Sequence, residues 1–356
     1  MSNAYVPGLL LERSTVVRRR RELPLPGRAL VEQGTQVTAA SPVLAAQLPG
    51  EIEIVRVADR LGFDAEDVVP LLTLKPGDPV SKGQVVCEKR YLFGLGSAVV
   101  HAPCDGTVEF FTTGNAHLGI RRSATELKLN AYISGKVVEV EPTKSVTIET
   151  TAALIQGIFG VGGERVGTLF PLLDVPPARP ITTADVDKLP DDLSNRIIVG
   201  GASIDSAALA ALAKRGAIAL VTGSIRSATL TEYVGYEIGV SITGDEQVPM
   251  TLIVTEGFGL LPLSPRVFEL LRELAGKTAS VSGQTQVRAG AVRPEIVVPL
   301  DEAPMRSATP GGELQIGSRV RCVRTPYFGE IGEVSGLPLA PEKVDSGAVV
   351  RVARVR

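Results

Sequence analysis

Short runs of Val and Ile that alternate with polar residues dominate the first half of the chain. Between residues 28 and 150 these runs are separated by Gly, Pro and Asp, which are typical of turns. Only the stretch from Ala58 to Leu72 is a candidate for a longer helix. We therefore predict a β domain over residues 28–150. A solvated N-terminal arm over residues 1–27 would precede it, with four arginines at 18–21 that could also bind an anion.

One pattern occurs twice within this β region. The first copy spans residues 31–45 and the second begins at residues 74–86. In each copy a glycine, Gly34 or Gly77, stands where a turn accepts a positive φ angle, and Val residues on either side alternate between two faces of a small sheet. The second copy continues into residues 102–108, where Asp-Gly marks a tight hairpin turn.

The second copy contains Lys75-Pro76-Gly77-Asp78, then Lys82-Gly83-Gln84, then Ala102-Pro103 through Val108. This spacing resembles the barrel-sandwich hybrid of lipoyl and biotinyl carrier domains, and related barrels in Rnf- and Nqr-type electron-transport subunits. The resemblance implies that the β domain is a barrel-sandwich hybrid. Carrier domains modify a lysine at a hairpin tip, and the corresponding segment here contains Lys89 without the usual Met-Lys-Met or Asp-Lys-Ala setting. We expect the fold without the cofactor.

Residues 151–195 combine a glycine-dense stretch with a proline-rich one. The glycines at 157–167 suggest a loop that binds phosphate through backbone amides. The Lys-Ser/Thr of a P-loop is missing, however, and Arg165 stands where a dinucleotide fingerprint has a glycine. We predict a structural glycine turn followed by a linker at residues 171–180, which hold four prolines.

Apolar strands and helical periodicity alternate over residues 196–300. This order predicts an α/β three-layer domain with a mostly parallel sheet. The predicted strands are 196–201, 217–223 and 250–259, and the predicted helices are 203–215, 229–236 and 264–274. Because parallel strands end at one edge of a sheet, their glycine-rich loops should gather there.

That edge is the predicted ligand site, for a small anionic or hydroxylated molecule. The alternative is that its glycines only permit tight turns. The candidate residues are Gly200, Gly201, Thr222, Gly223, Ser224, Thr255, Glu256, Gly257 and Gly259, with Asp245 and Arg288 as further polar candidates.

The last segment, residues 314–356 after a linker at 301–313, contains alternating Val residues, then an aromatic pair before a turn glycine. It resembles the KOW motif of NusG-type elongation factors and several ribosomal proteins. The resemblance implies an SH3-like β module that binds RNA or protein. The family's last strands are missing here, so the barrel should be open or completed from elsewhere. The candidate RNA-binding residues are Arg321, Arg324, Tyr327 and Phe328.

Both histidines and two of the three cysteines fall within the β region, at Cys87, His101, Cys104 and His117. Thiolate and imidazole are zinc ligands, but no paired knuckle spacing is present. We therefore predict buried cysteines, surface histidines and no metal. No other cofactor motif is complete.

The composition of the whole chain limits the cellular compartments and the kinds of partner that we expect. The chain of 356 residues has 37 Lys and Arg against 39 Asp and Glu, so no chain-wide basic field favours nucleic acid. An odd number of cysteines argues against a disulfide framework. The N-terminus lacks the order of a signal peptide, and no apolar run approaches the ~18 residues of a membrane helix. We expect a cytoplasmic protein without membrane insertion.

The sequence predicts several folded modules, but it offers no nucleophile-base pair for catalysis. This favours a non-catalytic adaptor that docks a protein partner and has a small-ligand site at the α/β edge. One alternative is an enzyme or enzyme subunit that acts on a small anionic metabolite through Glu256, Asp245 and Arg288. Another is an RNA- or ribosome-associated factor that binds through the KOW-like module.

Overall fold

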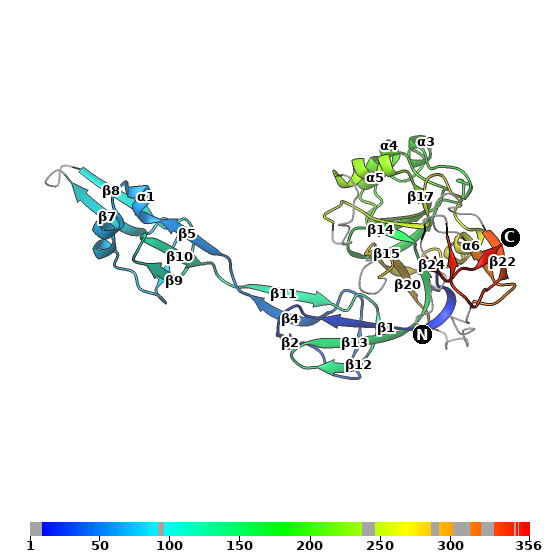
Figure 1. Ribbon diagram of the computed structural model, residues 1–356, viewed down its shortest axis with the longest axis horizontal. Helices are drawn as coiled ribbons and strands as arrows, with labels where there is room; N and C mark the ends of the chain where they lie inside the picture. Colours follow the sequence, from blue (N-terminus) through cyan, green and yellow to red (C-terminus); the bar gives the residue numbers. More distant parts are fainter. Residues whose placement is uncertain are drawn as a thin grey trace.

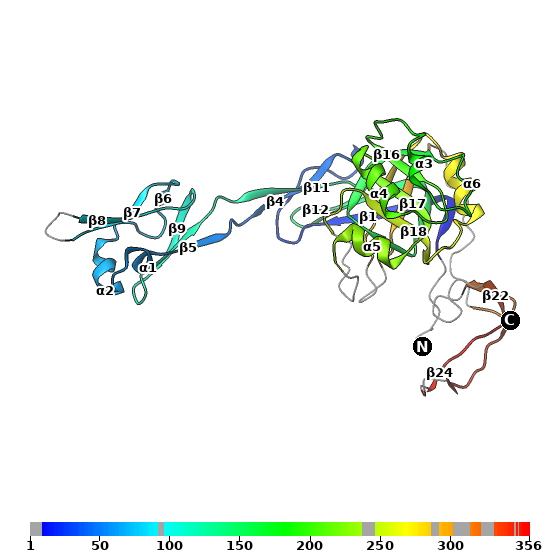
Figure 2. The ribbon, with the colours of Figure 1, turned by 90° about the horizontal axis from the view of Figure 1, so that it is seen from above.

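The computed structural model is elongated, with a large body at one end and a small lobe at the other (Figure 1). A two-stranded ribbon joins them, and the view from above shows the same separation (Figure 2). The structure describes residues 9–91, 96–236, 246–285, 292–301, 314–321, 331–344, 347 and 349–356.

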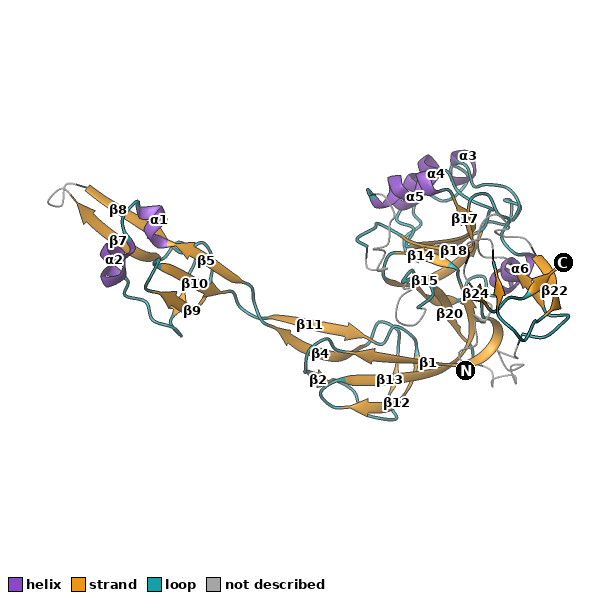
Figure 3. Cartoon of the chain, viewed as in Figure 1, coloured by secondary structure: helices purple, strands orange, loops and turns teal. Residues whose placement is uncertain are grey.

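Strands account for many more of the described residues than helices do, and the helices are short (Figure 3). The largest sheet has 11 strands and is mixed. In order across the sheet they are β14 (Phe159–Val161), β18 (Thr251–Phe258), β17 (Ala219–Ile225), β16 (Arg196–Val199), β15 (Glu164–Pro171), β19 (Thr278–Ser282), β20 (Glu295–Pro299), β13 (Ser145–Gln156), β12 (Gly135–Glu141) and β3 (Gln36–Val37), with β1 (Leu11–Glu22) paired to β13.

Four neighbours, β15, β16, β17 and β18, run parallel to one another. The pairings of β14, β19, β20, β13 and β12 with their neighbours are antiparallel. The predicted alternation of strands and helices therefore holds for the parallel part, and antiparallel strands extend the sheet on both sides of it.

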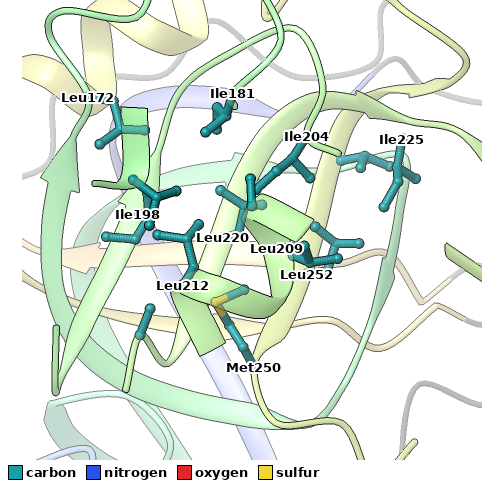
Figure 4. Packing of buried hydrophobic residues seen from close by; sticks show 14 of the residues in the cluster. Leu172, Ile181, Ile198, Ile204, Leu209, Leu212, Leu220, Ile225, Met250 and Leu252 are labelled. Atoms are coloured by element: carbon teal, nitrogen blue, oxygen red, sulfur yellow. The ribbon is translucent and has the colours of Figure 1, made fainter. Parts of the chain in front are cut away.

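Apolar side chains cover both faces of the parallel strands. On one face Ile198 and Leu220 pack with α4 (Ser206–Lys214) and α5 (Ser227–Val234), in the cluster shown in Figure 4. On the other face the intervening residues, such as Ile197, pack with α6 (Pro265–Glu273). Because side chains alternate along a strand, continuous Val and Ile runs such as Arg196–Val199 serve both clusters.

Two segments differ from the sequence prediction. Residues 11–22, expected in a solvated arm, form β1, which pairs along its length with β13. The segment 151–195, expected to hold a loop and a linker, contains the end of β13, all of β14 and β15, and α3 (Thr183–Val186). In both cases the pairing strand lies far away in the sequence, so the local pattern carries no sign of it.

The predicted β domain consists of two units with separate hydrophobic cores. The proximal unit includes β1, β3, β12 and β13 of the large sheet, together with β2 (Arg28–Ala29), β4 (Pro42–Leu48) and β11 (Thr125–Asn130). The distal unit, residues 52–121, is the small lobe. It contains β5 (Ile52–Arg56), α1 (Val57–Leu61), α2 (Ala65–Val68), η1 (Val69–Leu71), β6 (Pro79–Val80), β7 (Val85–Tyr91), β8 (Gly96–His101), β9 (Gly106–Thr112) and β10 (His117–Arg121).

The two units repeat one strand arrangement. In the distal unit the sheet order is β5-β10-β9-β6, and β7 pairs with β8. In the proximal unit the corresponding order is β1-β13-β12-β3, and β4 pairs with β11. The distal unit is inserted between β4 and β11, so these two strands form the ribbon seen in Figure 1.

Backbone hydrogen bonds confirm that the repeated sequence pattern forms the same turn twice. The Gly34 N–H donates to the Val137 carbonyl at 2.8 Å, and the Gly77 N–H donates to the Val108 carbonyl at 2.8 Å. Both glycines have positive φ, +93° and +96°. The pairing of β9 with β10 and that of β12 with β13 each shift register beside Val108 and Val137. The distal unit is therefore a second copy nested within the first.

The last described residues form two small sheets. One contains β21 (Arg319–Arg321), β22 (Ile331–Gly336) and β25 (Arg354–Val355), and the other contains β23 (Glu342–Lys343) and β24 (Val349–Val350). In the part of the chain that the structure describes, none of the helices has the length and apolar character needed to cross a membrane.

Candidate functional site

The predicted sheet-edge residues are brought together, but most of them lie within strands. Thr222, Gly223 and Ser224 belong to β17, while Thr255, Glu256 and Gly257 belong to β18. The Thr222 hydroxyl donates to the Gly201 carbonyl at 3.0 Å, and the Ser224 hydroxyl donates to the Ala202 carbonyl at 2.8 Å. These small polar residues thus bind the backbone of the neighbouring segment. From the sequence alone, such residues within a strand look the same as small polar residues in a ligand-binding loop.

Close packing explains the glycines at this edge. A Cβ atom on Gly223 would come within 2.4 Å of the Leu261 carbonyl oxygen. Gly201 has a φ of +70°, and a Cβ atom there would come within 2.6 Å of Ile181. Gly200 and Gly259 also have positive φ. These positions favour the interpretation that the glycines permit tight backbone approaches.

Glu256 is buried, with 4% of its surface exposed. Its Oε1 accepts a hydrogen bond from the Ser264 N–H at 3.2 Å, at the start of α6, and one from the Thr255 hydroxyl at 3.3 Å. Glu256 therefore joins β18 to the next helix. The other polar candidates of this edge, Asp245 and Arg288, lie outside the described residues.

The other predicted sites also contain some residues that the structure describes and some that it does not. Arg321 lies in β21, whereas Arg324, Tyr327 and Phe328 lie outside the described residues, so RNA binding stays a prediction. Cys87 and Cys104 are buried in the distal core, His101 is exposed as expected, and His117 is half-buried. Within the described ranges, no group of three or more His, Cys, Asp or Glu side chains could hold a metal ion.

The arginines of β1 lie among carboxylates from other strands. Arg21 donates to both Glu164 carboxylate oxygens, at 2.6 and 2.7 Å, and its guanidinium carbon lies 5.5 Å from the centre of the Tyr132 ring. Arg19 pairs with Glu295. Burial raises the pKa of the Tyr132 hydroxyl well above 10. This cluster joins the proximal unit to β15 and β20, so it serves the structure.

Lys89, in the position suggested by the carrier-domain resemblance, is part of β7. Its ammonium group pairs with Asp67 at 2.8 Å and lies 4.1 Å from the centre of the Phe63 ring. Only 18% of its side chain is exposed. Lys89 thus holds α2 against the hairpin strand.

An apolar row crosses the outer face of the distal sheet, from exposed isoleucines on β5 to the half-buried Phe110 on β9. Ile52 and Ile54 in β5 are exposed, whereas Val55 between Ile54 and Arg56 is buried. Ile54 pairs with Gly119 of β10, and Gly119 pairs with Phe110 of β9. We call the surface formed by Ile52, Ile54, Arg56, Phe110 and Gly119 the distal outer face.

The corresponding row of the proximal unit is polar. Because Val108 and Val137 occupy the same position, Phe110 corresponds to Glu139, Gly119 to Thr147 and Ile54 to Arg20. This proximal row carries hydrogen bonds and ion pairs. The Thr147 hydroxyl donates to Glu139 at 3.2 Å, and Arg20 pairs with Glu22 and Glu141 at 3.2 and 3.0 Å. Along this one row the same backbone therefore carries polar and charged side chains in one copy and apolar residues in the other.

A shallow pocket adjoins the apolar row, lined by Ile54, Arg56, Asp59 and Arg60. Neither guanidinium in this pocket has an ion-pair or hydrogen-bond partner among the described residues. The other arginines of the distal region all have carboxylate partners: Arg90 pairs with Glu88, Arg121 with Glu109 and Arg122 with Glu53. The face therefore combines exposed apolar groups with two available cations.

Comparisons of the chain with protein-family models, with curated proteins and with solved structures find no match. We therefore take the function from the residues of this face.

Proposed function

We propose that the chain is a non-catalytic adaptor that docks a protein partner on the distal outer face. The observation that carries the proposal is the contrast between Ile54–Gly119–Phe110 and the polar row Arg20–Thr147–Glu139 at the same positions of the other copy. A solvent-facing sheet is normally polar, as in the proximal copy. An apolar row in its place favours a covered surface.

The placement of the distal unit supports this function. The β4 and β11 strands hold it away from the large body, so a partner reaches its outer face without contact with the main sheet (Figures 1 and 2). The sheet edge at Thr222 and Glu256 is no part of the proposal, because its polar groups already bind each other and the adjacent backbone.

Three finer assignments accompany the proposal. We propose that the proximal and distal units are barrel-sandwich hybrids, that residues 196–300 form a three-layer α/β domain, and that residues 314–356 form a KOW-like module. We also propose that the protein acts in the cytoplasm, where its three cysteines would stay reduced.

A native pull-down with the tagged full-length chain tests the adaptor function. The variant Ile54→Asp places a charge on the apolar row, where Ile54 is 51% exposed. Val16→Asp is the matched control, because Val16 is 46% exposed on β1, the strand that corresponds to β5. The proposal predicts a protein retained by wild type and Val16→Asp but lost from Ile54→Asp. Equal recovery with both variants contradicts it.

A further inference from the structure

We propose that the occupant of the distal outer face is an extended segment of a partner protein that places an apolar side chain on Ile54 and a carboxylate between Arg56 and Arg60. This inference rests on the adaptor function and specifies the partner's chemistry. The spacing follows from β5, where Ile54 and Arg56 are two residues apart and face the same side.

The charge of the pocket favours a carboxylate. Arg56 and Arg60 are two cations beside one carboxylate, Asp59, so the pocket has a net positive charge that one further carboxylate neutralises. Charge-assisted hydrogen bonds from guanidinium groups to carboxylates are among the strongest that proteins form. A guanidinium that already has a partner, as in the Arg121–Glu109 pair, would have to break that contact first.

The edge position of β5 favours an extended segment. Among the described residues, β5 pairs on one side only, with β10. An edge strand leaves backbone N–H and C=O groups available to a chain laid along it. The exposed side chains of Ile52 and Ile54 would then lie beside alternate side chains of that segment.

The same residues disfavour a nucleic acid. Ile52 and Ile54 offer no flat ring on which a base can stack, and Phe110, which packs over Gly119, is the single aromatic residue of the distal outer face. Sequence-tolerant recognition of single strands stacks successive bases on several rings. Asp59 in the pocket would repel the successive charges of a phosphate backbone, whereas a single carboxylate can be placed between the two arginines.

Site-specific photo-crosslinking in the native cell tests the inference. The full-length chain carries p-benzoylphenylalanine in place of Phe110, or in place of the exposed Ile52 in a second preparation, and the crosslinked segment is mapped by mass spectrometry. The inference predicts a protein segment with Asp or Glu within two residues of an apolar side chain. Crosslinks to RNA, to lipid, to a second copy of this chain or to a segment without a carboxylate overturn it.

Reversal of the charges in the pocket tests the inference quantitatively through the crosslink yield. Arg56→Glu/Arg60→Glu should lower the crosslink yield about tenfold, and exchange of the partner's carboxylate for Lys should restore it. The matched control is Lys75→Glu/Lys82→Glu, two exposed lysines of the same unit, which should leave the yield within about twofold.

The variants separate the two proposals. Loss of binding in Ile54→Asp with an unchanged yield in the arginine variant would overturn the acidic segment and leave the adaptor function in place. An unchanged yield in both variants would overturn both.

Discussion

The ring of Phe110 covers Gly119 on the neighbouring strand, where a Cβ atom would come within 2.5 Å of the ring carbon Cε1. The two residues pair directly across β9 and β10. Aromatic coverage of a cross-strand glycine keeps a strand paired where the glycine has no side chain of its own. In the distal unit it also places an aromatic ring over β10, the strand between β9 and β5, and thereby continues the apolar row from Ile54.

We predict strong coupling between Gly119 and Phe110. Gly119→Ala should destabilise the distal unit by about 1–3 kcal/mol because the new methyl group displaces the ring. In Gly119→Ala/Phe110→Ala the ring is absent, so the double variant should be more stable than the sum of the single variants predicts. Hydrogen exchange of the distal backbone amides in the full-length chain measures these differences. Additive effects would contradict the contact.

We predict equal costs for alanine at the two repeated turns. Gly34 and Gly77 have φ angles of +93° and +96°, and an added Cβ would meet nothing within 4 Å at either position. Gly34→Ala and Gly77→Ala should therefore each cost about 1–2 kcal/mol from backbone strain alone. Exchange rates of amides in the unit that contains each glycine measure the two costs separately. Clearly unequal costs would contradict the structural equivalence of the turns.

We predict that the pair formed by Arg21 and Glu164 is needed to hold the end of β1 against β15. Only 11% of the Arg21 side chain is exposed, so Glu164→Gln leaves a largely buried cation without its charged partner. The expected loss of stability is about 2–4 kcal/mol. Glu22→Gln is the control, because the pairs of Glu22 with Arg20 and with Lys144 are both exposed and each should contribute at most about 1 kcal/mol. Chemical denaturation of the full chain compares them, and equal effects would contradict the structural role.

We predict a loss of stability at alkaline pH through Tyr233. Burial raises its pKa to about 12, and its hydroxyl accepts a hydrogen bond from the Met250 N–H at 2.9 Å. The unfolded chain ionises this tyrosine near pH 10, so the stability it contributes is present below pH 10 and is lost as the pH rises to about 12.

Replacement of the hydroxyl group tests this assignment. Tyr233→Phe should flatten the dependence of stability on pH between about 10 and 12 by roughly 1.4 kcal/mol per pH unit. Tyr236→Phe serves as the comparison, because Tyr236 is 46% exposed and burial raises its pKa less than that of Tyr233, so this variant should change the slope less. Thermal unfolding followed across this pH range gives the slopes. A wild-type slope in Tyr233→Phe would contradict the assignment.

Local patterns predicted much of the strand content and the repeated turn, because alternating Val residues and turn glycines determine both within a few residues. They could not predict the nesting of the units. The partner of β4 is β11, which lies beyond the whole distal unit, and pairing over such a separation leaves no local signal. The β1 strand was missed for a related reason. In the sequence, Arg21 indicates an exposed segment, and only the structure shows that Glu164 lies beside it as its ion-pair partner.

The distal outer face was also missed in the sequence. Ile52 and Ile54 alternate with polar residues, which is the pattern of any half-buried strand, and periodicity does not show which face is buried. Their exposure in the structure identifies the isoleucines as the outer residues, and the second copy, with Arg20 where the distal unit has Ile54, shows that a polar residue fits the same position. At the sheet edge the sequence predicted a ligand site where the structure shows internal contacts. Thr222 and Ser224 resemble loop residues, but they lie in a strand and donate hydrogen bonds to backbone carbonyls.

Hydrogen exchange of the full-length chain with and without its captured partner is the most direct test of the docking surface. We predict slower exchange in β5, β9 and β10 when the partner is present and unchanged exchange in β1, β12 and β13, which form the same sheet in the other copy. Protection confined to the proximal strands or to the sheet edge around Thr222, with none at Ile54 and Phe110, would contradict the proposed function.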